Sequence, residues 1–165
     1  VYKRQGTYYT TDFDLNNHYE EEYIIFEKFD LHKVWSVVFF DAEQGFYYLK
    51  RFKFEESNKV FSFIGEAEGS YLVGLSSERH PRFEIVFGGK YATRPVEVIQ
   101  ADEFIGEKSF KARGKRLTTF EVDRIQETTP LVIEEENEIS ADVEFEVTNP
   151  SEIADNEEQM KLEFE

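Results

Sequence analysis

The sequence predicts an all-β fold built from repeated units. Of its 165 residues 16% are aromatic. Before residue 125, apolar and β-branched residues fall into runs of about five to ten, bounded by Gly, Asp, Asn or Pro, as strands are. None of these runs keeps a helical period. Two short sequences also recur at a spacing typical of blades or solenoid coils, which bury their apolar faces against one another.

The first half of the chain supplies four of the expected strands. Residues 6–13 and 22–29 are rich in Thr, Tyr, Ile and Phe, which favour extended backbone. Residues 34–41 contain the wholly apolar run 37–40, and residues 45–54 alternate between two faces. One face of the 45–54 strand carries aromatic residues around a Lys, and the other changes from apolar to basic along its length.

The second half supplies five more expected strands. Residues 70–75 and 82–87 are dominated by Leu, Val, Ile and Phe, and residues 95–100 follow with Val and Ile after a Pro. Residues 103–110 and 115–122 mix Phe, Ile, Leu and Val with charged side chains. Nearly every ordered segment before residue 125 is therefore predicted to be a strand.

Two internal echoes support a repeated architecture. Phe-Ile-Gly-Glu occurs at residues 63–66 and again at 104–107. A strand-like run at residues 36–40 is echoed at 83–87, in each case followed by a turn and a basic strand. The two offsets differ slightly, and variable loop lengths between units account for that. The echoes favour a propeller-like array over a single sandwich.

Charge divides the chain into a nearly balanced body and an acidic tail. The net charge is −16, but residues 131–165 hold 13 Asp or Glu and one Lys, a net charge of −12. Residues 1–130 carry 22 acidic and 18 basic side chains, a net charge of −4. This composition predicts a disordered tail. Its alternating runs, 143–147 and 160–164, are interpreted as residual apolar residues, with addition to a sheet edge as the alternative.

Several classes of protein are disfavoured by what the sequence lacks. It has no Cys and its three His stand apart, so neither disulfides nor a metal site is expected. No apolar run approaches the roughly 20 residues of a membrane helix. We expect a soluble, cytoplasmic protein without membrane contact. Residues 1–5 resemble the translated sequence of a transposase adapter used in library preparation, so native sequence is expected from Gly6, within a longer reading frame.

The basic segment, residues 108–116, is the main candidate for a binding site. Its cations are Lys108, Lys111, Arg113, Lys115 and Arg116. Five such cations would displace counterions from a phosphate backbone, with a log-log salt slope of roughly −4 to −5. The alternative is a solvated face whose cations pair with local carboxylates. These are Glu103, Glu107, Glu121 and Asp123. No base-reading motif and no catalytic constellation accompanies the segment.

Four segments of the chain carry a resemblance to a known family. They read GTYYTTDFDLNNHYEEE, VWSVVFFDAEQGFYYLKRFKFE, PRFEIVFGG and FIGEKSFKARGKRLTTFEVDRIQE. In this order they resemble the C-terminal domain of the bacterial type IIA topoisomerase A subunit. The likeness covers residues 6–130. It is greatest to the subunit of topoisomerase IV and next to that of gyrase, and the final QMKLEFE also resembles the end of such subunits.

This resemblance implies a β-pinwheel, a propeller-like disc of antiparallel four-stranded blades. Residues 6–130 would form about three blades, incomplete at the N-terminus, and residues 131–165 an acidic tail. A basic outer rim would wrap duplex DNA through its phosphates and respond to DNA geometry rather than to bases. The rim would include the basic segment and the cations of other blades. These are Lys50, Arg51, Lys53 and Arg94.

The parent enzymes of this family are ATP-dependent type II DNA topoisomerases. They cleave DNA with a Tyr that follows an Arg, and ATP and Mg act through other regions and the B subunit. This chain has neither an Arg-Tyr pair nor a phosphate-binding loop, so it is expected to be non-catalytic by itself and to hold no cofactor. The implied partners are duplex DNA, the B subunit and a second A subunit, at the nucleoid. A gyrase box, Gln-Arg-Arg-Gly-Gly-Lys-Gly, is absent, which leans toward topoisomerase IV, but the first blade that carries this box would lie upstream of Gly6.

Two other functions stay open from the residues. A propeller-like protein-interaction module would use the basic segment to bind acidic partners, and a carbohydrate-binding β-domain would use the many Tyr and Phe side chains. The tail adds a hypothesis of its own, in which its negative charge competes with DNA for the rim cations.

Overall fold

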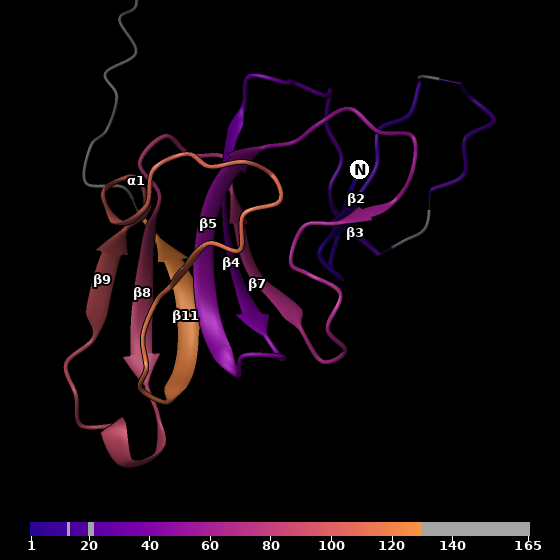
Figure 1. Ribbon diagram of the computed structural model, residues 1–165. Coiled ribbons are helices and arrows are strands. Elements are labelled where there is room, and N and C mark those ends of the chain that lie inside the picture. Colours follow the sequence, from indigo (N-terminus) through magenta and orange to yellow (C-terminus); the bar gives the residue numbers. More distant parts are fainter. Residues whose placement is uncertain (13, 20–21, 130–165) are drawn as a thin grey trace, which may run out of the picture. The chain divides into compact units, whose positions relative to one another are not determined.

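The computed structural model describes residues 1–12, 14–19 and 22–129, and almost all of their regular structure is strand. The chain divides into two units, Val1–Ile133 and Glu134–Glu165, and every described residue belongs to the first. The described strands form three small antiparallel sheets (Figure 1). A mostly β fold is therefore confirmed, while the predictions for residues 131–165 lie outside the described residues.

Three sheets account for the strands. The first contains β1 (Tyr2–Lys3), β2 (Thr7–Tyr8), β3 (Tyr23–Ile25) and β6 (Phe61–Ser62), in the order β3-β1-β2-β6. The second contains β4 (Val34–Asp41), β5 (Phe46–Lys53), β7 (Tyr71–Ser76) and β10 (Lys115–Arg116), in the order β10-β5-β4-β7. The third contains β8 (Arg82–Phe87), β9 (Glu97–Gln100) and β11 (Val122–Thr128), in the order β11-β8-β9. Between β8 and β9 lies the 3-10 turn η1 (Gly89–Tyr91), and after β9 the short helix α1 (Ala101–Phe104).

One strand order recurs in all three sheets. In each, the first strand of a unit lies between its second and third strands: β1 between β2 and β3, β4 between β5 and β7, and β8 between β9 and β11. In the first two sheets a two-residue strand from the following unit, β6 or β10, pairs with the outer edge of the second strand. The described fold is therefore a series of three similar units, and the first two sheets are each completed by the next unit.

One of the two sequence echoes falls at corresponding places in these units. Residues 36–40 lie in β4 and residues 83–87 lie in β8, the central strands of the second and third sheets. Both copies of Phe-Ile-Gly-Glu lie in the connection between the second and third strands of a unit. The first copy follows β6, whereas the second begins at the last residue of α1 and precedes β10. The echo of residues 36–40 at 83–87 therefore marks a structural repeat, whereas the two copies of Phe-Ile-Gly-Glu lie on opposite sides of the equivalent short strands β6 and β10.

Two apolar clusters lie on opposite faces of the second sheet. Trp35, Val37 and Phe39 of β4 belong to the first cluster, and Val38 belongs to the second. Because successive side chains of a strand point to opposite faces, this division places the sheet between the two clusters. It also explains the continuous apolar run of β4, which is typical of strands that are buried on both faces.

The prediction of a strand at residues 103–110 is wrong. Instead, α1 ends at Phe104, where the amide of Ile105 donates to the carbonyl of Ala101 at 3.1 Å, and a loop follows. This connection leaves β9 in the third sheet and reaches β5 in the second, so the tertiary path overrides the strand preference of its residues.

Other boundaries were only partly predicted. Residues 115–122 divide into β10 and the first residue of β11, and β11 continues to Thr128 because it pairs with β8 along its length. The strands β2, β3 and β9 cover only parts of the expected runs 6–13, 22–29 and 95–100. The two-residue strand β6 had no predicted counterpart, because so short a strand carries no period. The long strands β4, β5, β7 and β8 are confirmed within one residue or so of their expected ends.

Residues 1–5, which were left out of the predicted fold, take part in the first sheet. Tyr2 is 4% exposed, and its ring lies 4.8 Å from that of Trp35 and 4.9 Å from that of Phe54, centroid to centroid. In β1 it pairs with Tyr8 and with Ile25. The adapter origin of these residues stays a prediction.

Candidate nucleic-acid interface

The basic segment runs along the outer edge of β5. At one end the amide of Lys108 donates to the carbonyl of Arg51 (2.8 Å), then β10 pairs with β5, and beyond it the amide of Leu117 donates to the carbonyl of Tyr47 (2.9 Å). Figure 1 shows this part of the chain, in orange, crossing over β5 on its way to β11. Pairing therefore brings the cations of the segment beside those of β5, which are distant in sequence.

Gly114 allows the segment to lie this close to β5. Its φ is +97°, in the left-handed region that favours glycine. A Cβ at this position would stand 2.6 Å from the carbonyl oxygen of Leu49 and 2.8 Å from the Cβ of Lys50. Any larger residue would therefore strain the backbone and push the basic segment away from the strand.

Lys50 does not lie on an exposed rim, in contrast to the prediction. Lys50 is 5% exposed. Its Nζ donates to the carbonyl of Phe110 (3.2 Å) and lies 4.5 Å from the ring centroid of Phe52. On β5 it shares the face that carries Tyr48 and Phe52 into the first apolar cluster. Burial lowers the pKa of Lys50 to about 8. Through its hydrogen bond to the carbonyl of Phe110, Lys50 therefore connects β5 to the backbone of the basic segment.

Two of the predicted cations pair with carboxylates. Lys53 Nζ lies 3.2 Å from Glu107 Oε1, and Arg113 lies 4.0 Å from Asp41 Oδ2 and 3.6 Å from Glu43 Oε2. The alternative interpretation of the sequence paired the cations of the basic segment with Glu103, Glu107, Glu121 and Asp123. In the described residues Arg113 pairs with other carboxylates, and the cation that pairs with Glu107 is Lys53 of β5, outside the segment. Their charge is partly neutralised before any ligand arrives.

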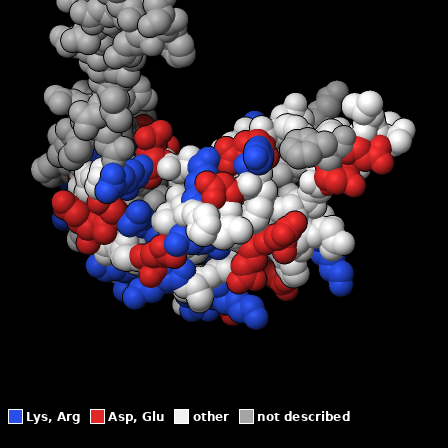
Figure 2. Space-filling view, turned by 90° about the horizontal axis from the view of Figure 1, so that it is seen from above, with Lys and Arg blue, Asp and Glu red and all other residues white. Residues whose placement is uncertain are grey.

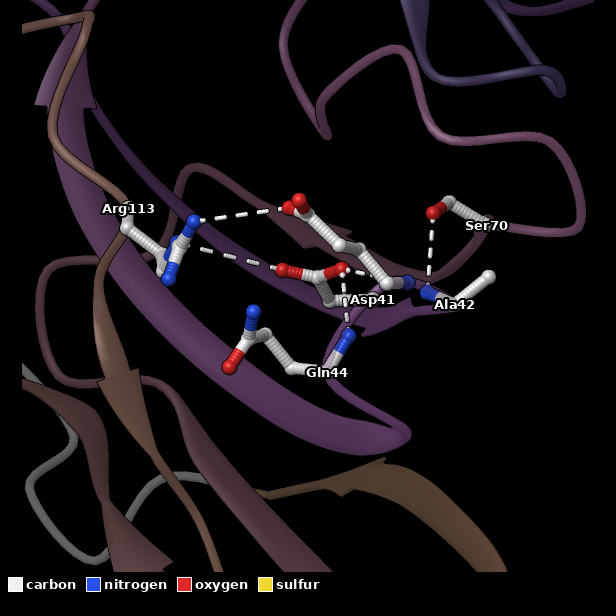
Figure 3. A network of polar contacts seen from close by, with 6 residues as sticks. Asp41, Ala42, Gln44, Ser70 and Arg113 are labelled. Carbon is white, nitrogen blue, oxygen red and sulfur yellow. Dashed lines mark hydrogen bonds and ion pairs between the residues drawn. The ribbon is translucent and has the colours of Figure 1, made fainter.

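The partner of Arg113 is itself held in place. Asp41 is 8% exposed and accepts hydrogen bonds from the amides of Glu43 (3.0 Å) and Gln44 (3.3 Å) in the turn after β4. The amide of Ala42 in the same turn donates to Ser70 Oγ (3.0 Å). Figure 3 shows Arg113 reaching toward this turn, with Asp41 at the centre of the network. Arg113 thus connects the basic segment to the β4–β5 hairpin.

The remaining predicted cations keep their charge available. Lys108 and Lys111 are exposed, and within the described part of the chain their side chains make no ion pair or hydrogen bond. Arg94, Lys115 and Arg116 are also exposed, and each lies over an aromatic ring. Arg51 is half-buried, with its Nε donating to Ser36 Oγ at 3.2 Å.

The distribution of charge on the surface is mixed. Figure 2 shows basic and acidic side chains interspersed over the face seen from above, with basic side chains gathering along its lower edge. This pattern fits a body whose net charge is only −4 over residues 1–130. Binding of an anion here would depend on individual cations rather than on a large uniform field.

One half-buried polar pair was not predicted from the sequence. His80 Nδ1 lies 2.7 Å from Asp102 Oδ2 and joins the residues before β8 to α1. Burial alone would raise the pKa of Asp102, but hydrogen bonds, above all the one from His80, lower it. The other carboxylate oxygen, Oδ1, is buried and has no partner within the described residues. His80 and Asp102 are far apart in the sequence, so no local sequence pattern predicts their contact.

Two further kinds of site are absent from the described residues. No group of three or more His, Asp or Glu there is arranged to hold a metal ion. No helix among them has the length and apolar character to cross a membrane.

Comparison with known families identifies the domain. Residues 1–129 match a family model described as the topoisomerase C-terminal domain of Bacteroidota. The chain belongs to this family. As a topoisomerase C-terminal domain it has a role in DNA topology and is part of a topoisomerase, which is the coarser part of what the resemblance implied. No curated protein and no solved structure matches the chain.

Proposed function

We propose that this topoisomerase C-terminal domain binds duplex DNA along its basic segment and wraps it, and thereby positions DNA for strand passage. The observation that carries the proposal is a set of exposed cations that, within the described residues, no carboxylate neutralises. They are Lys108, Lys111, Lys115, Arg116 and Arg94. Phosphates are the anions that such a set contacts on DNA, and they carry no sequence information.

Wrapping follows if the repeated units are blades of a β-pinwheel. The recurring strand order supports this, because each of the first two sheets takes a strand from the next unit. DNA that follows the edge of successive blades must bend, and bending costs a free energy that depends on DNA sequence. Specificity would then come from DNA deformability rather than from contacts to bases.

The parent enzyme in this proposal is a type II topoisomerase, and this chain belongs to its A subunit. The cleaving Tyr lies outside this sequence, which has no Arg-Tyr pair. ATP and Mg act through other regions and the B subunit, and a second A subunit completes the enzyme at the bacterial nucleoid. The likeness of the four sequence segments favours the A subunit of topoisomerase IV, with that of gyrase as the alternative.

The experiment measures DNA affinity of the full chain as a function of salt. A fluorescently labelled linear duplex is titrated with the protein, and log affinity is plotted against log salt concentration. Contacts from five cations give a slope of roughly −4 to −5, and the double variant Lys108→Ala with Lys111→Ala reduces its magnitude by about 2.

A matched control separates specific contacts from net charge. Lys28 and Lys59 are also exposed, lie outside the basic segment, and their double substitution by Ala changes the net charge equally. An equal loss of slope in the two double variants would contradict a defined interface, and so would selective binding of acidic proteins in place of DNA. Dyes at the two ends of the duplex test wrapping: the ends approach on binding if DNA is wrapped, and binding without approach refutes it.

A further inference from the structure

Arg94 lies against an aromatic platform. Its Cζ is 3.9 Å from the ring centroid of Phe120 and 5.1 Å from that of Phe87. The Phe120 ring is itself held by Phe87, at 5.9 Å between centroids, and by Tyr91, at 4.9 Å. Phe87 is 3% exposed and belongs to the second apolar cluster. The guanidinium of this exposed Arg is therefore supported by the half-buried ring of Phe120, which packs against the core ring of Phe87.

The two cations of β10 are supported in the same way. Lys115 Nζ lies 4.1 Å from the ring centroid of Phe104 and donates to the carbonyl of the same residue at 3.3 Å. Arg116 Cζ lies 4.6 Å from the ring centroid of Phe46. Phe104 packs against the second apolar cluster and Phe46 against the first. All three supporting rings are half-buried, so they present one face to the cation while the core holds them.

An aromatic ring positions a cation without neutralising it. The attraction comes from the negative face of the ring quadrupole, and the ring carries no net charge. A carboxylate partner, such as those of Lys53 and Arg113, adds a full negative charge that repels a phosphate. A cation on a ring therefore keeps its whole charge for a ligand and has already lost much of its side-chain freedom.

We propose that Phe46, Phe104 and Phe120 are positioning residues for DNA binding, which hold Arg116, Lys115 and Arg94 toward the phosphate backbone. The inference rests on the proposed function. It divides the interface into two kinds of contact: three cations ordered in advance on rings, and two unsupported lysines, Lys108 and Lys111, that become ordered only when DNA binds.

The test replaces each ring by a side chain of similar bulk without a quadrupole. Phe104→Leu, Phe120→Leu and Phe46→Leu should each weaken duplex binding by the full chain roughly two- to five-fold at fixed salt. The salt slope should stay unchanged, because the number of cations is unchanged. Lys115→Ala differs in kind, since it should reduce the magnitude of the slope by about 0.9. Phe104→Trp and Phe120→Trp, which keep an aromatic face, should bind with the affinity of the wild type.

Phe40→Leu is the matched control. Phe40 is also half-buried, and its ring packs against Tyr47 and Tyr71. This variant should bind DNA as tightly as the wild type. Proton NMR gives a readout that does not depend on DNA: ring currents should shift the side-chain protons of Lys115 and Arg94 upfield, and the shifts should vanish in Phe104→Leu and Phe120→Leu respectively.

The outcomes separate this inference from the proposed function. Unchanged affinity in all three Leu variants, while Lys115→Ala still lowers the slope, overturns the positioning role and leaves DNA binding in place. The positioning role is also overturned if Phe40→Leu weakens DNA binding as much as the other Leu variants do. It is overturned as well if the Trp variants bind as weakly as the Leu variants and the loss of affinity follows the loss of folded protein in urea titrations. Absence of salt-dependent binding by the wild type overturns the proposed function itself.

Discussion

Replacement of Gly114 by Ala should detach the basic segment from β5. The residue has a φ of +97°, and its missing Cβ leaves room for the carbonyl oxygen of Leu49, which a Cβ would approach to 2.6 Å. That contact is with backbone, which cannot rotate away as a flexible side chain would. The substitution therefore combines unfavourable dihedral angles with overlap between two chain segments.

The expected cost follows from these two terms. A non-Gly residue in the left-handed region costs about 1–2 kcal/mol, and overpacking against fixed neighbours typically adds about 1–3 kcal/mol. Ala also reduces the entropy of the unfolded chain, which returns about 0.4–1 kcal/mol. The free energy of unfolding should therefore fall by about 2–4 kcal/mol, a large share of the roughly 5–15 kcal/mol typical of a domain.

Urea unfolding and amide hydrogen exchange of the full chain would measure this. The amides of Lys108 and Leu117 donate to β5 at 2.8 and 2.9 Å, so their exchange reports local detachment even where the rest of the fold survives. Gly106 is the matched control in the same connection, because a Cβ there meets nothing within 4 Å. Stability within about 0.5 kcal/mol of wild type in Gly114→Ala, with unchanged exchange at both amides, would refute the reasoning.

Two further predictions concern pH. Burial lowers the pKa of Lys50 to about 8 from 10.5, so the unfolded state binds more protons than the folded state between these pH values. The free energy of unfolding of the wild type, relative to that of Lys50→Met, should therefore rise by about 2 kcal/mol from about pH 7.5 to about pH 9.5. Parallel curves of stability against pH for the two proteins would contradict this. The lowered pKa of Asp102 contributes stability above its unfolded pKa of 3.8 that is lost as pH falls through the folded value. His80→Ala should therefore cost about 1–3 kcal/mol near neutral pH and less in acid; a cost independent of pH would argue against the pair.

The long strands could be predicted because their evidence is local. In β4 the continuous apolar run, and in β5 and β8 the alternation, reflect which faces are buried, and those faces are read along one stretch of chain. The two-residue strand β6 was not predicted, and β10 was predicted as part of a longer strand, because both are defined by pairing with a strand of another unit. Their short sequences carry no period, and only pairing to β2 and β5 makes them strands.

The candidate interface shows the same division between local and distant evidence. The number of cations in the basic segment, and their clustering, could be read from residues 108–116 alone. Whether each of these charges is exposed and unpaired could not be read from the sequence. Lys50 is buried, Arg113 pairs with the turn after β4, and Lys115 lies on Phe104, three outcomes for side chains of the same sign.

Chemical composition thus decided that this protein is mostly β, lacks thiols and carries a cluster of cations in an acidic chain. The tertiary structure decided which of those cations are exposed and free of carboxylate partners within the described residues. The physical reason is that the field of a charge depends on its distance to other charges and on its exposure to water, and both are set by which strands pair. The pairing of β10 with β5 brings together residues from two units, and no stretch of sequence records that approach.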